Sequence, residues 1–276
     1  MTLSYDVNTG KAAPYSALTI VSTAAWGLGY FGMPHILLRF MAIEDEKKLK
    51  LSRRVATIWV VISLFVAVFI GVIGYTMSKV GALEMLTGSN SETIIVKISA
   101  LLSQHGVIFA LLAGVILAGI LASTMSTSDS QLLAASSAVS SDILGAFRKD
   151  SSNKNGSMAA ARITLLVISV VAAFIARNPD SSVFAIVSFA WAGFGAAFGP
   201  VVLFSLFWKR TNKWGALAGM VCGGSMVFIW KYLIRPLGGI WNIYELLPAF
   251  LIACAAIVIV SLLTPKPVSY THLRAH

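Results

Sequence analysis

The chain has 276 residues, of which 57% are hydrophobic and only 12% are charged, and its mean hydropathy is +0.83. A water-soluble domain does not carry so much apolar surface, so we expect an all-α, polytopic membrane protein that lies in a lipid bilayer. The formal net charge of +10 is explained by basic cytoplasmic loops and does not indicate a nucleic-acid partner. The two cysteines are isolated and form no disulfide or metal-binding pattern.

Apolar segments long enough to cross a bilayer, which takes about 20 residues, occur about seven times. The predicted spans are 17–40, 55–78, 106–133, 158–177, 183–208, 214–233 and 246–264. A polar segment, 1–16, precedes them. The one long connection on the outer side, 79–105, predicts an amphipathic helix with Ser89 or Ser91 as its cap.

Basic residues set the expected orientation of these spans. The larger group of Lys and Arg falls in the segments 43–54, 148–157 and 209–213 and after the last span. Cytoplasmic loops carry an excess of positive charge, so we expect these segments and the C-terminus to be cytoplasmic. The chain is then a multi-pass protein of the plasma (inner) membrane, and 1–16 is external.

The third predicted span is apolar in its first part and polar in its second. Gly106 to Ala122 is uncharged and apolar, and hydroxyl side chains then follow at membrane depth: Ser123, Thr124, Ser126, Thr127, Ser128 and Ser130, with Asp129 among them. Polar groups in hydrocarbon cost free energy unless they are paired. Two interpretations stay open at this point: the hydroxyls bond to carbonyls of their own helix, or they are ligands of a hard cation such as Na⁺.

The first predicted span has three glycines and a proline between Trp26 and His35. Each Gly costs about 1 kcal/mol and Pro about 3 kcal/mol relative to Ala in a helix, so we expect a break here. Trp26, Tyr30 and Pro34 recur at four-residue steps and would share one face of a helix. Broken helices form substrate sites in secondary transporters, and a proline kink used only for packing is the alternative.

A second glycine-rich region, Trp191–Pro200, lies in the fifth predicted span. Glycines let helices approach closely, so we expect a packing seam here in preference to a moving gate.

Three stretches carry a resemblance to a known family: WGLGYFGMPHILLRFMA (26–42), MSTSDSQLL (125–133) and SFAWAGFGAAFGPVVLFSLFWKR (188–210). They are similar to the sodium:solute symporter family, and within it to its proline-transporting members. The resemblance implies a leucine-transporter-type fold of two inverted five-helix repeats. It places the second repeat (core helices 6–10) at 17–208 and two C-terminal helices at 209–265. The first repeat, the N-terminal half of such a protein, is missing, so we expect an inactive fragment of a transporter.

The resemblance also implies site residues. It maps the Na⁺ site onto the hydroxyls of Ser126 and Thr127 and the backbone carbonyl of Ser123. It maps the proline site onto Trp26, Tyr30 and Pro34. Met33 stands where Gln is often expected, which leaves the identity of the solute open.

The function implied is Na⁺-coupled symport of L-proline by alternating access. No enzyme is expected, because the sequence shows no nucleophile–base pair, metal-ligand spacing or nucleotide loop. Two alternatives stay open: a Na⁺ symporter of another small solute, such as pantothenate or a carboxylate, and a transporter-like membrane sensor domain. Asp129 also keeps coupling to H⁺ open.

The short tail, 266–276, departs from the apolar pattern. Its last residues, SYTHLRAH (269–276), carry two of the four histidines. We interpret 269–276 as a translated adaptor or cloning scar and do not interpret His272 and His276 as metal ligands.

Overall fold

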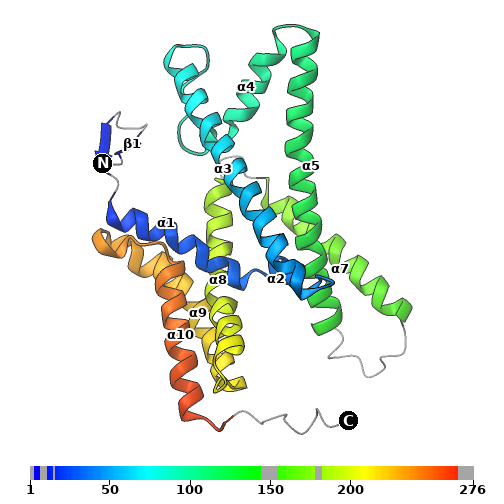
Figure 1. Ribbon diagram of the computed structural model, residues 1–276, viewed down its shortest axis with the longest axis vertical. Helices are drawn as coiled ribbons and strands as arrows, with labels where there is room; N and C mark the ends of the chain where they lie inside the picture. The colour runs from blue at the N-terminus through cyan, green and yellow to red at the C-terminus, as the bar shows by residue number, and fades with distance from the viewer. Residues whose placement is uncertain (1–2, 7–10, 15, 144–153, 178–181, 267–276) are drawn as a thin grey trace. The chain divides into compact units, whose positions relative to one another are not determined.

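The computed structural model describes residues 3–6, 11–14, 16–143, 154–177 and 182–266 (Figure 1). The fold is helical, as expected, apart from one short antiparallel hairpin of β1 (Leu3–Asp6) and β2 (Lys11–Pro14). The hairpin falls in the predicted polar, external segment 1–16, where no strand was predicted. The tail 267–276, with its predicted scar, lies outside the described residues.

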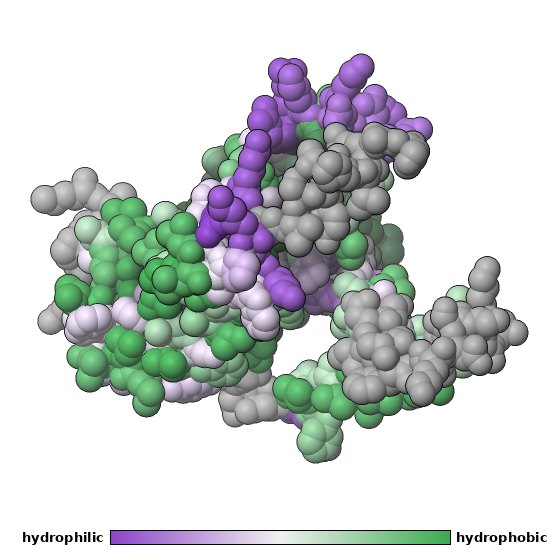
Figure 2. All heavy atoms as spheres, turned by 90° about the horizontal axis from the view of Figure 1, so that it is seen from below, coloured by the Kyte–Doolittle hydropathy of each residue, from purple (hydrophilic) through white to green (hydrophobic). Residues whose placement is uncertain are grey.

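Six helices of the described chain are long and apolar enough to cross a membrane. They correspond to the second to seventh predicted spans, and the first predicted span is interrupted. Large apolar side chains stand exposed along them, among them Trp59 (69%) and Phe65 (70%), and apolar residues cover much of the face seen in Figure 2. Such surfaces are stable in contact with lipid and not with water, so the chain is a multi-pass membrane protein.

The described chain forms two compact units, 1–41 with 184–276 and 42–183. The first unit contains α1 (Ala17–Gly29), α2 (Pro34–Met41), nearly all of α8 (Val183–Phe207), α9 (Lys213–Ile229) and α10 (Leu246–Leu263). The second contains α3 (Leu49–Lys79), α4 (Ile94–Ser103), α5 (Val107–Ser137) and α7 (Lys154–Ile175). The predicted division into a repeat over 17–208 and a helix pair over 209–265 stays a prediction.

The predicted break in the first span is confirmed. After Gly29 the backbone tightens into a 3-10 turn, Tyr30–Gly32, and Met33 is extended (φ −86°, ψ 112°) before α2 begins at Pro34. A residue that precedes proline is disfavoured in the helical region, which explains the extended Met33. The first span is therefore two short α-helices joined by a 3-10 turn and one extended residue.

α9 and α10 pack through a stripe of small residues. Gly215, Gly219 and Gly223 lie at four-residue steps on one face of α9, and the atoms nearest to them include those of Ser261, Ile257 and Ala253 on α10. Without a Cβ on α9, the two backbones come close enough for α10 side chains to fill the gap. The core of the first unit continues this contact through α8, with buried Ala192, Ala196, Val227, Leu246, Ala249 and Phe250.

In the second unit, α5 packs against α4 and α7. The Ser136 hydroxyl of α5 donates a hydrogen bond to the Ala161 carbonyl of α7 (2.7 Å), and Gly74 of α3 leaves room for the side chain of Ile94. The helix predicted within 79–105 is present as α4, but its predicted cap is wrong. A 3-10 turn, Gly88–Thr93, contains Ser89 and Ser91, and α4 begins only at Ile94.

Candidate substrate and sodium sites

Trp26 lies in a stack of aromatic rings next to the break in the first span. Its ring is nearly parallel to those of Phe184, Trp191 and Tyr244, with centroid separations of 5.5, 5.5 and 5.9 Å. The Trp191 indole nitrogen also donates a hydrogen bond to the Trp26 carbonyl (3.0 Å). Offset stacking of this kind stabilises aromatic pairs, so Trp26 has a defined orientation.

Tyr30 and Pro34 lie on the two sides of the break. The Tyr30 ring meets the edge of Trp191 (4.8 Å, 84°) and remains half exposed (50%). Pro34 is exposed at the start of α2, while Met33 before it is buried. The structure therefore brings Trp26 and Tyr30 to the same partner, Trp191. The link at 30–33 interrupts the single helical face that the four-residue spacing would give, and Pro34 lies beyond it.

The expected packing seam in α8 is confirmed, and it is what holds the broken span in place. A Cβ built on Gly32 would collide with the backbone of Phe194, and one on Gly195 would lie 2.7 Å from the Gly29 Cα. One on Gly199 would lie 2.8 Å from the Phe250 ring. Only glycine at these positions permits such a close approach of the α1 end, and of the Phe250 ring of α10, to α8.

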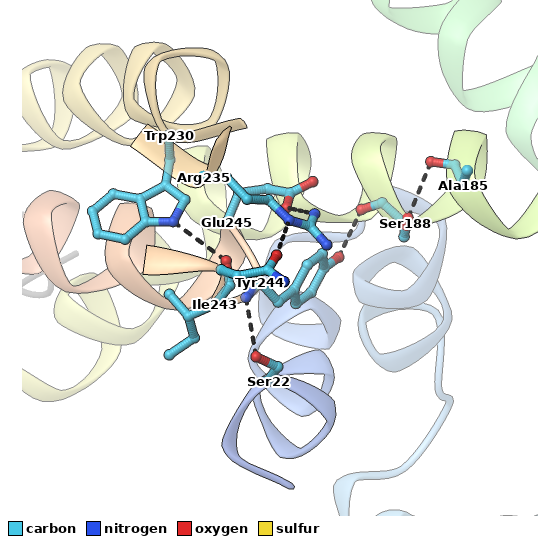
Figure 3. A network of polar contacts seen from close by, with 9 residues as sticks. Ser22, Ala185, Ser188, Trp230, Arg235, Ile243, Tyr244 and Glu245 are labelled. Carbon is cyan, nitrogen blue, oxygen red and sulfur yellow. Dashed lines mark hydrogen bonds and ion pairs between the residues drawn. The ribbon is translucent and has the colours of Figure 1, made fainter. Parts of the chain in front are cut away.

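Tyr244 connects the α9–α10 loop to the same cluster (Figure 3). Its backbone N–H donates to the Ser22 hydroxyl of α1 (3.1 Å), and its own hydroxyl donates to the Ser188 carbonyl of α8 (2.6 Å). Burial is the main cause that raises the pKa of Tyr244 above its usual value, with a further contribution from Glu245. The hydroxyl therefore stays protonated and remains a donor at physiological pH.

The sequence patterns predict no role in the site for Phe184, Trp191 or Tyr244. Phe184 and Trp191 are seven residues apart, which places them on one face of α8. This spacing is a signal in the sequence from which an aromatic pair on α8 could have been predicted. Tyr244 is separated from Trp26 by more than 200 positions, and no local pattern predicts that contact.

The hydroxyls of α5 lie in the second unit. Thr124 donates to the Ile120 carbonyl (2.9 Å), Thr127 to the Ser123 carbonyl (3.1 Å) and Ser130 to the Thr127 carbonyl (2.8 Å). Ser123, Ser126 and Thr127 are all exposed. The interpretation that these hydroxyls bond within their own helix therefore holds for Thr124, Thr127 and Ser130.

These bonds leave oxygen lone pairs available at the predicted ligands. Thr127 uses its proton on the Ser123 carbonyl, so its oxygen remains an acceptor, and a carbonyl has a second lone pair. Neutral oxygen donors are the ligands that a hard cation prefers. Within the described residues there is no group of three or more His, Cys, Asp and Glu side chains that would hold a metal ion. The donor set at 123–127 thus fits an alkali ion better than a transition metal.

A family model matches residues 3–223, more than half of the chain, and its description is the sodium:solute symporter family. The chain belongs to the sodium:solute symporter family. No solved structure is significantly similar to this chain.

Curated relatives agree with this assignment. The sodium/proline symporter of Haemophilus influenzae is 42% identical over 252 residues, which cover 91% of this chain and 49% of the relative. The osmoregulated proline transporter of Bacillus subtilis is 39% identical over 252 residues, with the same coverage of 91% and 49%. The sodium/proline symporter of Escherichia coli is 39% identical over 251 residues, or 91% and 48%. The chain therefore spans about half the length of the curated relatives it matches.

Proposed function

We propose that this chain is the second half of a Na⁺-coupled symporter that imports L-proline by alternating access. The activity is assigned to a complete transporter that contains this chain together with a first repeat. The observation that carries the proposal is the stack of aromatic rings around Trp26 at the break in the first span. The proline transporters among the relatives support the choice of solute.

In this proposal, Trp26 and the half-exposed Tyr30 form an apolar wall that suits the pyrrolidine ring of proline, and Pro34 lies at the start of α2 on the other side of the break. Aromatic faces bury an apolar ring well, and the Tyr30 hydroxyl supplies a polar group at its edge. Ser126, Thr127 and the Ser123 carbonyl supply the oxygen ligands of Na⁺.

Coupling needs Na⁺ to favour the conformation that binds proline, because a ligand with equal affinity for two states shifts neither. A proline zwitterion carries no net charge, so one accompanying Na⁺ lets the membrane potential act on transport. A potential of 100 mV supplies about 2.3 kcal/mol per charge, and a tenfold Na⁺ gradient adds about 1.4 kcal/mol. Together they sustain a proline ratio of roughly 500-fold.

The test is uptake of labelled L-proline by the complete transporter in proteoliposomes with an inside-negative potential. We expect uptake to require external Na⁺, to stop when choline replaces Na⁺ and to change little with pH. Uptake that persists without Na⁺ and follows the pH gradient would show proton coupling instead. Competition by a panel of amino acids, pantothenate and carboxylates identifies the solute, and proline must be the strongest competitor.

A further inference from the structure

A loop that lies outside the predicted five-helix repeat contacts Trp26. The loop between α9 and α10 ends at Tyr244, whose ring stacks on Trp26 at 15° between the ring planes. The same residue is hydrogen-bonded to α1 through Ser22 and to α8 through Ser188. Tyr244 therefore connects the first half of the broken span to α8 through Ser22 and Ser188 (Figure 3), and its ring contacts Trp26.

Tyr244 is itself held from both sides along the chain. The next residue, Glu245, is almost fully buried (1% exposed), and its carboxylate accepts a hydrogen bond from Arg235 Nη1 (2.8 Å). Arg235 Nε donates to the Asn242 side chain (3.0 Å), and the Trp230 indole donates to the Ile243 carbonyl (3.3 Å). A buried carboxylate that lost its cation would be strongly destabilising, so this network fixes the loop in one conformation.

We propose that Tyr244 is a positioning residue for the solute: it holds Trp26 in the orientation that binds proline, and the C-terminal helix pair thereby sets the affinity of the transporter. The inference rests on the proposed function, in which Trp26 contacts the solute. Tyr244 acts through Trp26, by the stacking of its ring on the Trp26 ring. Its hydroxyl is hydrogen-bonded to Ser188, which restrains the ring. The contact with Trp26 is made by the ring itself.

The experiment measures KM and kcat for proline uptake by the complete transporter. Tyr244→Leu removes the ring, and we expect KM to rise about 3- to 10-fold with little change in kcat or in Na⁺ dependence. Tyr244→Phe keeps the ring and should restore KM to within about twofold of the wild type. Tyr232→Leu is the matched control, in the π-helical turn Trp230–Ile234 that continues α9. Its ring lies against Phe189 (6.1 Å), so the substitution should leave KM unchanged.

A double-mutant cycle with Trp26→Leu decides whether Tyr244 acts through Trp26. In the Trp26→Leu background, Tyr244→Leu should add less than about twofold to KM. An equal increase in both backgrounds, or a loss confined to kcat, would overturn the proposal. If Tyr244→Leu does not accumulate in the membrane, Tyr244→Met replaces it under the same criterion.

The two proposals fail in different ways. A wild-type transporter that does not carry proline contradicts the proposed function, and the cycle is then measured with the solute that it does carry. A wild-type transporter that carries proline while Tyr244→Leu leaves its KM unchanged contradicts only the positioning role.

Discussion

Thr124 and Thr127 are two threonines on α5 that make the same kind of hydrogen bond. Each donates its hydroxyl proton to a carbonyl four residues earlier, at 2.9 and 3.1 Å. Three residues apart on a helix, they point in directions that differ by about 60°. If these hydroxyls served only the hydrogen bond within the helix, replacing either threonine by alanine would have the same small effect on the Na⁺ dependence of uptake. They therefore form a matched pair for the assignment of the Na⁺ ligands.

We predict that Thr127→Ala raises the Na⁺ concentration for half-maximal proline uptake at least about tenfold, because a hydrogen-bonding group that contacts a charge contributes about 1.5–3 kcal/mol. Ser126→Ala should have a similar effect, and Thr124→Ala should change the value less than about twofold. The measurement is initial uptake in proteoliposomes over a Na⁺ titration. Equal responses of Thr124→Ala and Thr127→Ala would mean that the hydroxyls serve the helix alone.

At the scale of single residues, the local sequence predicted that Trp26 and Tyr30 lie beside a break but not which aromatic rings contact them. The Gly and Pro content of 26–35 marks these side chains as neighbours of a break, since the cost of those residues is local. Tyr244 reaches Trp26 through a loop whose conformation depends on Arg235 and the buried Glu245. That contact is tertiary, so no periodicity in the sequence encodes it.

At the scale of elements, α1 and α8 meet through glycines that differ sharply in their surroundings. A Cβ on Gly195 would lie 2.7 Å from the Gly29 Cα and 2.9 Å from Leu246 Cδ1, whereas one on Gly193 would meet nothing within 4 Å. Backbone atoms cannot move aside as a flexible side chain can. A side chain at position 195 would therefore fit only if one of the two helices shifted.

We predict that Gly195→Ala destabilises the transporter by about 1–3 kcal/mol, seen as a lower apparent Tm in detergent at a fixed scan rate. It should also raise KM for proline, because the displaced α1 end carries Trp26. Gly193→Ala is the control in the same helix, and it should be neutral or stabilising by up to about 1 kcal/mol, since Ala is the better helix former. A Gly195→Ala variant as stable as Gly193→Ala would contradict the close packing described for this seam.

Elements whose limits follow from local rules were predicted most accurately. The break before Pro34 follows from the restriction that proline imposes on the preceding residue, and the seam in α8 follows from its glycine spacing. The cap of α4 was misplaced because the 3-10 turn Gly88–Thr93 contains the serines that pattern alone would choose as caps. The β1–β2 hairpin was not predicted, since each of its strands is only four residues long and β2 (KAAP) shows no strand alternation.

At the scale of the whole molecule, hydropathy predicted the membrane class and six of the spans, because an apolar segment of about 20 residues has few other stable environments. It did not predict which helices would pack together. The grouping of the broken span with α8, α9 and α10 depends on glycines and aromatic rings that are distant in sequence. The distribution of Lys and Arg adds an orientation, and this orientation is a separate prediction.

We predict that the segments 43–54 and 209–213 and the end of α10 face the cytoplasm, while 79–105 faces outward. The first of these carries Lys47, Lys48, Lys50, Arg53 and Arg54, whereas 79–105 carries only Lys79 and Lys97, and positive charge is retained on the cytoplasmic side. The measurement uses reporter fusions in the complete transporter after residues 50, 85, 213 and 265. A reporter active only in the cytoplasm should be active after 50, 213 and 265 and inactive after 85. Position 50 lies in the first turn of α3 and position 85 lies beyond its end, so the two are the matched pair. The same reporter activity at both would show that α3 does not cross the membrane. A reversed pattern would show that the basic segments do not set the orientation of this chain.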